Sequence, residues 1–190
     1  MASHPTLQVI YDEHGALSAV LRSIGLLLSE HRRRGSLPDF TVLRAMLFYI
    51  DEFPERIHHT KESELLFPRI RERCPALRPV LDRLEVEHER GESAVRDLEH
   101  AVTGWQLMGD SSRESFQLLA QAFTTTYLGH MEVEENYVLP VAGEFLTAAD
   151  WRELDEELCG QRSAFNETLT RGHRELYSRI VAPSPALKQP

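Results

Sequence analysis

Residues 58–68 read HHTKESELLFP, and residues 130–140 read HMEVEENYVLP. In both stretches a histidine is followed four residues later by a glutamate, then by an apolar run, and a proline closes the stretch. Residues four apart lie on the same face of an α-helix, one turn from each other. The duplicated pattern therefore predicts two helices that each present a histidine–glutamate pair, His58 with Glu62 and His130 with Glu134.

Apolar residues recur at helical spacing along most of the chain, and strand-like alternation is essentially absent. The spacing predicts four amphipathic helices joined by short loops, over residues 6–34, 38–73, 77–103 and 113–141. Pro54 falls inside the second of these, where we expect a kink or a short break. The predicted fold class is all-α, an up-down-up-down four-helix bundle with an additional C-terminal helix.

The domain organisation follows from these segments. Residues 1–146 are expected to form the bundle, and residues 147–181 a C-terminal helical extension with its helix over residues 148–180. The last stretch, residues 182–190, is rich in proline and is expected to be disordered. A short polar connection is expected between the third and fourth helices, over residues 104–112.

Composition excludes several classes of protein. The chain of 190 residues is 42% hydrophobic and 27% charged, with a formal net charge of −9, which argues against a nucleic-acid partner. No apolar run is long enough to span a membrane, and the N-terminus has neither the basic nor the apolar region of a secretory signal. The two cysteines match no metal or redox spacing. We therefore expect a cytoplasmic protein, without nucleic-acid or membrane partners.

Two further histidines fall on the predicted core faces. The apolar stripe of the first helix runs from Ile10 through His14 to Leu17. In the third helix, Leu84 is followed at the same spacing by His88. Together with the duplicated pairs, four histidines and two glutamates therefore point at one core.

These six polar groups need partners, because an uncompensated charge in a core costs several kcal/mol. One interpretation is a network of hydrogen-bonded histidine–carboxylate pairs without metal. The other is a pair of metal ions, each bound by two histidines and bridged by both glutamates. That interpretation, which the duplicated pattern favours, uses every one of the six residues: His14, His58, Glu62, His88, His130 and Glu134.

The type of ligand indicates the type of metal. Imidazole and carboxylate ligands without thiolate suit iron or manganese, with zinc as a further alternative. The predicted cofactor is two iron ions joined by an oxo or hydroxo bridge. Each iron would then keep about one position open for a small ligand such as dioxygen, nitric oxide or peroxide.

Residues near the predicted ligands have expected places as well. His59 lies about 100° around the helix from the residue before it, so we expect it at the side of the helix or in solvent, with a place behind the ligands as the alternative. Glu135 is expected in solvent. Glu85 is a candidate to orient His88, and Glu92 is a candidate for a weak extra ligand.

The motifs resemble those of the hemerythrin-like family, also called the HHE cation-binding domain family. The resemblance rests on His14 in DEHGAL, on His88 in VEHERG and on the two duplicated stretches, and it spans residues 6–145. It implies a four-helix bundle that holds a non-heme di-iron centre with the same six ligands. Members of the family carry or sense dioxygen, handle iron or nitric oxide, or decompose peroxide.

The chain departs from oxygen-carrying hemerythrins, which have two histidines a turn apart in the third helix and a histidine–aspartate pair in the fourth. Here Leu84 and Glu92 flank His88 at those spacings, and the fourth helix carries His130 with Glu134. One nitrogen ligand fewer favours redox or peroxide chemistry over reversible oxygen carriage. Three functions stay open: a binding or sensing protein in oxygen, redox or iron homeostasis, which we favour; a peroxide-decomposing, catalase-like enzyme; and a bundle that uses metal only for structure. No protein partner can be identified.

Overall fold

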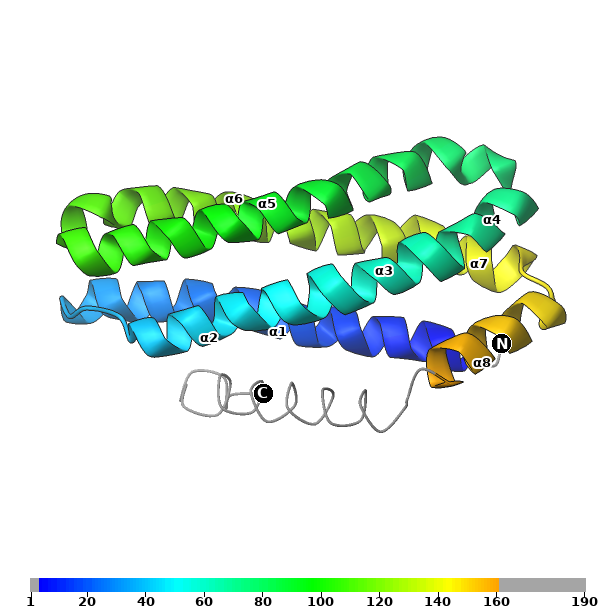
Figure 1. The fold of residues 1–190 in the computed structure, drawn as a ribbon, viewed down its shortest axis with the longest axis horizontal. Helices are drawn as coiled ribbons and strands as arrows, with labels where there is room; N and C mark the ends of the chain where they lie inside the picture. Colours follow the sequence, from blue (N-terminus) through cyan, green and yellow to red (C-terminus); the bar gives the residue numbers. More distant parts are fainter. Residues whose placement is uncertain (1–3, 161–190) are drawn as a thin grey trace.

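The computed structural model of the chain describes residues 4–160. Within that range every regular element is helical and no strand occurs. Figure 1 shows long helical segments side by side, with the chain turning back at the ends of the molecule. The all-α class predicted from the apolar spacing is therefore confirmed.

The first segment is a single helix, α1 (Pro5–Arg34). Pro5 occupies its first turn, where the missing N–H of proline leaves no hydrogen bond unmade. The helix ends at Gly35, whose φ of 62° is a left-handed conformation that glycine adopts without strain. The arginines at positions 32–34 lie in the last turn, where their charges complement the helix dipole.

The second segment stays helical from residue 40 to residue 73. It comprises α2 (Phe40–Ile50), η1 (Asp51–His58), α3 (His59–Lys61), η2 (Glu62–Leu66) and α4 (Phe67–Arg73), of which η1 and η2 are π-helical. It begins at Asp39, whose carboxylate accepts hydrogen bonds from the backbone N–H groups of Thr41 and Val42. At Pro54 the chain does not break but widens, and the N–H of His59 donates to the Pro54 carbonyl five residues earlier.

The third and fourth segments complete the four. They comprise η3 (Pro75–Leu77), α5 (Arg78–Met108), η4 (Gly109–Ser112), α6 (Arg113–Val133), the π-helical η5 (Glu134–Val138) and α7 (Leu139–Phe145). The connection between α5 and α6 is shorter than expected, because α5 continues to Met108 and the chain turns only at Gly109, with φ 76°. Both η2 and η5 begin at a motif glutamate, Glu62 and Glu134, so the duplication extends to the backbone. Such π turns are frequent at functional sites.

The buried core consists of two apolar clusters with a polar layer between them. On α1, His14 separates Ile10 of one cluster from Leu17 of the other. In the second segment, Ile50 and Leu66 likewise belong to different clusters, and the first motif lies between them. The polar residues singled out in the sequence therefore meet at one level of the molecule.

Helix α8 (Ala148–Gly160) packs at one end of the four segments (Figure 1). Its Trp151 is buried and stacks on His4, with ring centroids 4.0 Å apart. The carboxylate of Asp150 accepts two hydrogen bonds from Arg73 at 2.9 Å and further bonds from the backbone N–H and hydroxyl of Thr147. Helix α8 is therefore docked at this end through Trp151 and Asp150.

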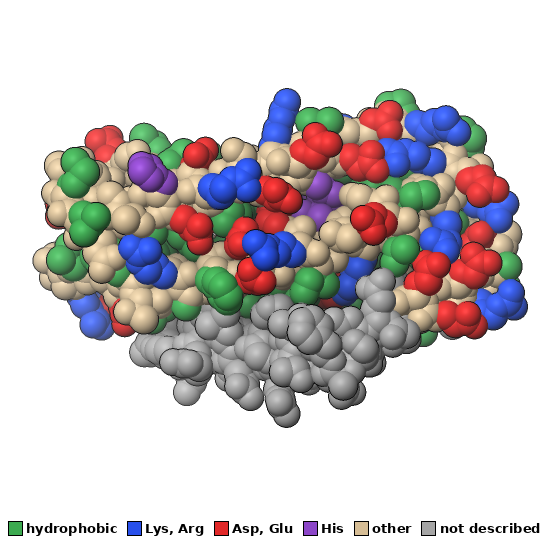
Figure 2. Space-filling model, in the orientation of Figure 1, with side chains coloured by type: hydrophobic (Ala, Val, Ile, Leu, Met, Phe, Trp, Pro, Cys, Tyr) green, Lys and Arg blue, Asp and Glu red, His purple; other side chains and the backbone are tan. Residues whose placement is uncertain are grey.

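Figure 2 shows acidic and basic side chains interspersed over the visible face. Between residues 4 and 160, no helix combines the length and the apolar character that a membrane span requires. Helix α8 covers the first part, residues 148–160, of the range expected for a C-terminal helix. The remainder of that range and the proline-rich stretch at residues 182–190 lie outside the described residues.

Candidate metal centre

The structure brings all six predicted ligand residues into the polar layer. They come from different helical elements: His14 from α1, His58 from η1, Glu62 from η2, His88 from α5, His130 from α6 and Glu134 from η5. None is more than 7% exposed. They form two overlapping groups whose potential ligand atoms lie within 4.8 Å of one another, and both groups contain Glu62 and Glu134.

The four histidines form two pairs that face each other through Nε2. In the first pair, Nε2 of His14 and Nε2 of His58 are 3.0 Å apart. In the second pair, the same atoms of His88 and His130 are 2.9 Å apart. Two nitrogen ligands about 2.1 Å from one ion and at right angles would be about 3.0 Å apart. Each pair therefore has the spacing of two neighbouring ligands of a single ion.

Each motif glutamate divides its two oxygens between the two pairs. Oε1 of Glu62 lies 3.5 Å from Nε2 of His58, whereas its Oε2 lies 3.6 Å from Nε2 of His88. Glu134 is arranged the same way, with Oε1 3.2 Å from Nε2 of His130 and Oε2 3.4 Å from a nitrogen of the first pair. This is the arrangement that two bridging carboxylates need.

None of the four oxygens of Glu62 and Glu134 accepts a hydrogen bond, although all are buried. A neutral polar group that is buried without a partner destabilises the fold by roughly 1–3 kcal/mol, and a buried carboxylate without a partner destabilises it by more. Burial and the adjacent Glu134 carboxylate raise the pKa of Glu62 well above its usual value. A network of hydrogen-bonded histidine–carboxylate pairs would need these oxygens as acceptors. The observed arrangement instead fits cations.

Glu13 and Glu87 hold the outer nitrogen of one histidine in each pair. Nδ1 of His58 donates to Glu13 and Nδ1 of His130 donates to Glu87, both at 2.8 Å. Such a carboxylate fixes the ring and its tautomer, leaving Nε2 free for an ion. Although burial favours its neutral form, the contacts of Glu13 with His58 and Lys61 hold its pKa below the usual value. The sequence analysis did not identify either glutamate. The available signal was that a glutamate directly precedes His14 and another directly precedes His88.

The outer nitrogens of His14 and His88, Nδ1 in both, also have partners. Each partner is the residue directly after a motif glutamate: Glu135 follows Glu134, and Ser63 follows Glu62. Nδ1 of His14 lies 3.0 Å from Oε1 of Glu135, and Nδ1 of His88 lies 3.0 Å from Oγ of Ser63. Glu135 was expected in solvent, and this was wrong, because its partly exposed side chain reaches His14. The contacts of His14 and His88 thus occupy equivalent positions in the duplicated sequence, but one partner is a glutamate and the other a serine.

Two acidic residues that were expected near His88 lie elsewhere. Glu85 accepts hydrogen bonds from Arg71 at 2.7 and 2.6 Å instead of orienting the histidine. Glu92 has a side chain 58% exposed and pairs with Arg96 at 3.6 Å, so it is not placed as an extra ligand. The spacing on the helix does not reveal the arginines on the surface that bind both carboxylates.

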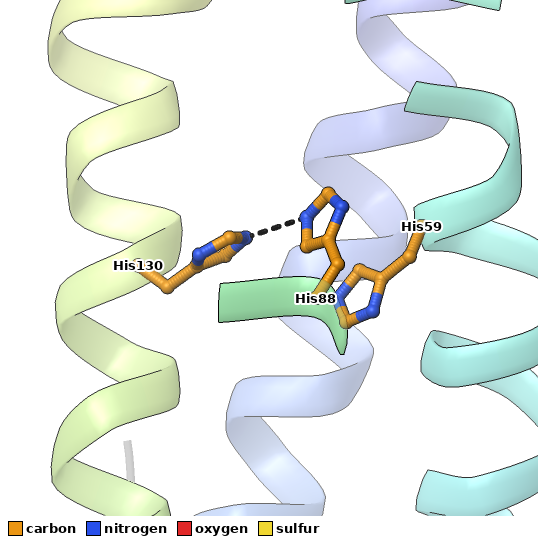
Figure 3. Close-up of side chains that lie close together, drawn as sticks. All are labelled: His59, His88 and His130. Atoms are coloured by element: carbon orange, nitrogen blue, oxygen red, sulfur yellow. Dashed lines mark hydrogen bonds between the residues drawn. The ribbon is translucent and has the colours of Figure 1, made fainter. Parts of the chain in front are cut away.

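His59 is buried, only 6% exposed, and the expectation of a place at the side of the helix or in solvent was wrong. Its ring stacks on that of His88, with centroids 3.9 Å apart and planes 11° apart (Figure 3). Its Nδ1 lies 3.3 Å from Oε2 of Glu55. The π turns on both sides of His59 change the rotation per residue, so the angle expected for an α-helix does not apply.

The sequence matches the family described as Hemerythrin HHE cation binding domain over residues 6–142. No curated protein and no solved structure matches the chain. The matched range includes all six residues of the polar layer and the four long helical segments almost completely. The chain belongs to the hemerythrin HHE cation-binding domain family.

Proposed function

We propose that this protein binds two iron ions, one at each histidine pair, with Glu62 and Glu134 as bridges between them. The pair of ions then binds dioxygen, nitric oxide or peroxide in the service of oxygen, redox or iron homeostasis in the cytoplasm. The scaffold is an up-down-up-down four-helix bundle extended by a C-terminal helix. Manganese or zinc are the alternative metals.

One observation carries the proposal. Each motif glutamate points one oxygen at the first histidine pair and the other at the second, and neither oxygen has a hydrogen-bond donor. A single ion would use only half of this arrangement. Bridging carboxylates between two ions in a helical bundle are the known solution for iron and manganese pairs.

The residues of the chain provide four donors to each ion, two nitrogens and two oxygens. An octahedral ion keeps about two more positions for solvent and for an added ligand. When bound, the iron pair supplies or accepts electrons. The apolar clusters on both sides of the layer limit the access of water, and the outer contacts of the histidines keep Nε2 directed inward.

The proposal is tested by iron content and visible absorption of the full chain purified from iron-supplemented cells. We expect about two irons per chain and the absorption of an oxygen-bridged iron pair. The variant Glu62→Ala should lose most of both ions, because one residue serves both positions. The matched variant Glu64→Ala, on the exposed side of the same turn, should keep them. Less than one metal per chain in the unsubstituted protein would contradict the proposal.

The same preparation separates binding from turnover. Rapid release of oxygen from added peroxide, abolished in Glu62→Ala, would assign a peroxide-decomposing enzyme. Absence of turnover together with spectral changes on adding nitric oxide would leave a binding or sensing protein. Full iron content without any response to small ligands would indicate a structural metal.

A further inference from the structure

A buried polar group outside the six ligand residues lies beside the second histidine pair. It consists of Glu55 on η1, His59 on α3 and Tyr127 on α6, each at most 6% exposed. Oε1 of Glu55 and the hydroxyl of Tyr127 have no hydrogen-bond partner. Since buried polar atoms are nearly always paired, these two oxygens call for a further partner.

The oxygens of this group gather at one spot against the backbone of Gly91 on α5. A Cβ at this position would lie 2.6 and 2.8 Å from the two carboxylate oxygens of Glu55 and 2.7 Å from the hydroxyl of Tyr127. Only a glycine lets these oxygens approach the backbone so closely. The side chains of two different helical segments therefore direct their oxygens at the same place, and each segment leaves one of them without a partner.

The contact between Glu55 and His59 has the length expected for two ligands of one ion. Oε2 of Glu55 lies 3.3 Å from Nδ1 of His59. The hydrogen bonds of Glu13 and Glu87 to histidines of the centre are shorter, at 2.8 Å each. Two ligand atoms about 2.1 Å from one ion, at the tetrahedral angle, lie about 3.4 Å apart. The contact is therefore long for a hydrogen bond to a carboxylate and suits a shared ion.

An ion at Nδ1 of His59 is distinct from the ion proposed at the second pair. Figure 3 shows the ring of His59 lying against that of His88, while His130 approaches His88 from another helix. An ion bound through a ring nitrogen lies in the plane of that ring. Because the rings of His59 and His88 are 3.9 Å apart and nearly parallel, no single ion lies in both planes. The two ions would nevertheless be neighbours, since a nitrogen of His59 lies within 4.8 Å of nitrogens of the second pair.

The charges around Glu55 favour a cation. Within residues 4–160, His59 is the one basic side chain with a nitrogen within 4.0 Å of the Glu55 carboxylate. Two acids nearer the surface, Glu92 and Asp51, act on this carboxylate through their own charges, and their side chains are 58% and 26% exposed. A buried carboxylate beside other acids is unfavourable unless a cation compensates it. The same acids attract a divalent cation from solvent toward the buried group.

We propose that Glu55, His59 and Tyr127 bind a third metal ion, a divalent transition-metal cation separate from the two ions of the centre. Imidazole, carboxylate and hydroxyl ligands suit ions such as Zn²⁺, Mn²⁺ and Fe²⁺. The ion gives a partner to both oxygens that lack one. The inference goes beyond the proposed function and uses none of its six ligand residues, so the two can fail separately.

The test uses the iron-loaded full chain and Zn²⁺ as the probe. Element analysis after equilibrium dialysis should show one zinc per chain in addition to the iron. Crystals of the same sample, measured at the zinc absorption edge, should place the zinc within about 2.3 Å of Nδ1 of His59 and of an oxygen of Glu55. Both readouts report on metal binding alone and require no activity.

Substitutions identify the residues that bind the zinc. Glu55→Gln keeps the shape of the side chain and should weaken zinc binding by more than about 100-fold, because losing a ligand costs more than losing a residue behind a ligand. Tyr127→Phe should weaken it by a smaller factor. His59→Phe, which keeps a ring against His88, should lose the zinc. All three variants should keep their iron, which also shows that they fold.

Glu52→Gln is the matched control, because Glu52 lies in the same helical element, is 28% exposed and pairs with Arg56 at 3.2 Å. It should change neither the zinc nor the iron content. No bound zinc, zinc bound only in exchange for iron or at another place, or equal zinc affinity in Glu55→Gln and the unsubstituted protein would overturn the inference. Loss of iron from His59→Phe would overturn it as well, because His59 would then serve the centre. Unsubstituted protein that binds zinc at Glu55 and His59 but no iron would support the inference and defeat the proposed function.

Discussion

The two halves of the centre agree in their ligands and differ in what surrounds them. Each half supplies one histidine from its first helix, a histidine–glutamate pair from its second, and a glutamate behind that histidine. The differences begin one residue away: His14 contacts the carboxylate of Glu135, whereas His88 contacts the hydroxyl of Ser63. A further histidine, His59, stacks on His88 and on Tyr127. Duplication thus places the candidate ligand residues, and the unduplicated residues make the surroundings of the two histidine pairs different.

Removing the metal should have the largest effect, because it breaks both halves at once. An ion present at 1,000 times its Kd stabilises the folded state by about 4 kcal/mol. Thermal unfolding with iron and with a chelator should therefore differ clearly in midpoint. Glu62→Gln should lose this difference, yet in the chelated state it should unfold at the same or a higher temperature, because a buried carboxylate beside Glu134 has been neutralised. Equal midpoints with and without iron would contradict this expectation.

Gly91→Ala should disturb only the half of the centre that contains His88 and His130. The added methyl meets Glu55 and Tyr127 at less than 3.0 Å, so we expect a loss of about 1–3 kcal/mol in the free energy of unfolding. Gly25→Ala is the control, because its Cβ would meet open space and alanine is the better helix former by about 1 kcal/mol. Denaturant unfolding of both variants measures the difference. A stabilised Gly91→Ala protein would mean that Glu55 and Tyr127 move aside without cost.

Glu13→Gln and Glu87→Gln test the contact that both halves share, a glutamate bound to Nδ1 of the motif histidine. Each removes the carboxylate behind one motif histidine, so each should weaken binding of one ion by about 10-fold to 100-fold. The loss should be larger for Glu13, whose side chain is 13% exposed against 27% for Glu87. Competition with a metal-binding dye measures both constants. Unchanged affinity in both variants would show that the rings are held by packing alone.

Helical periodicity was sufficient to predict the four segments and the six residues of the polar layer. Both follow from local spacing, since an apolar stripe that passes through a histidine places that histidine in the core. The same rule misplaced His59, because π turns on either side of it alter the rotation from one residue to the next.

The outer contacts could not be predicted from spacing, because they depend on which helices face each other. Glu135 and Ser63 reach histidines of other segments, and Glu85 turns to Arg71 instead. The rule that was missed is simple once the fold is known. The residue after Glu62 contacts His88, and the residue after Glu134 contacts His14, so each motif reaches the histidine that precedes the other motif.

Asp150 provides a reference, because its carboxylate lies outside both halves. Hydrogen bonds from Arg73 and Thr147 hold its pKa well below the usual value. A carboxyl with a depressed pKa stabilises the fold above its unfolded pKa of about 3.9, and this stabilisation is lost as the pH falls through the folded value. Asp150→Asn should therefore cost about 1–2 kcal/mol at pH 7 and progressively less below about pH 4.

This loss should be the same with iron and with a chelator, in contrast to changes at the centre. Denaturant unfolding of both proteins across the pH range measures it. Glu153→Gln is the control, since its side chain is 59% exposed and lies 3.5 Å from Arg69. A loss at Asp150 that depended on iron would connect the end helix to the metal centre.

The smallest effects should come from the residues that distinguish the outer contacts. Glu135→Gln removes a charge behind His14 and should weaken binding of the ion at the first pair a few-fold. This loss is smaller than the roughly 10-fold minimum for a buried partner, because the side chain of Glu135 is 39% exposed. Ser63→Ala removes only a neutral hydroxyl behind His88 and should have a smaller effect on the second pair. Separate dye competition for the two ions would show the difference. If Ser63→Ala weakened its ion more than Glu135→Gln weakened the other, the charge behind His14 would not explain why the two positions differ, and the stacked His59 would remain as the cause.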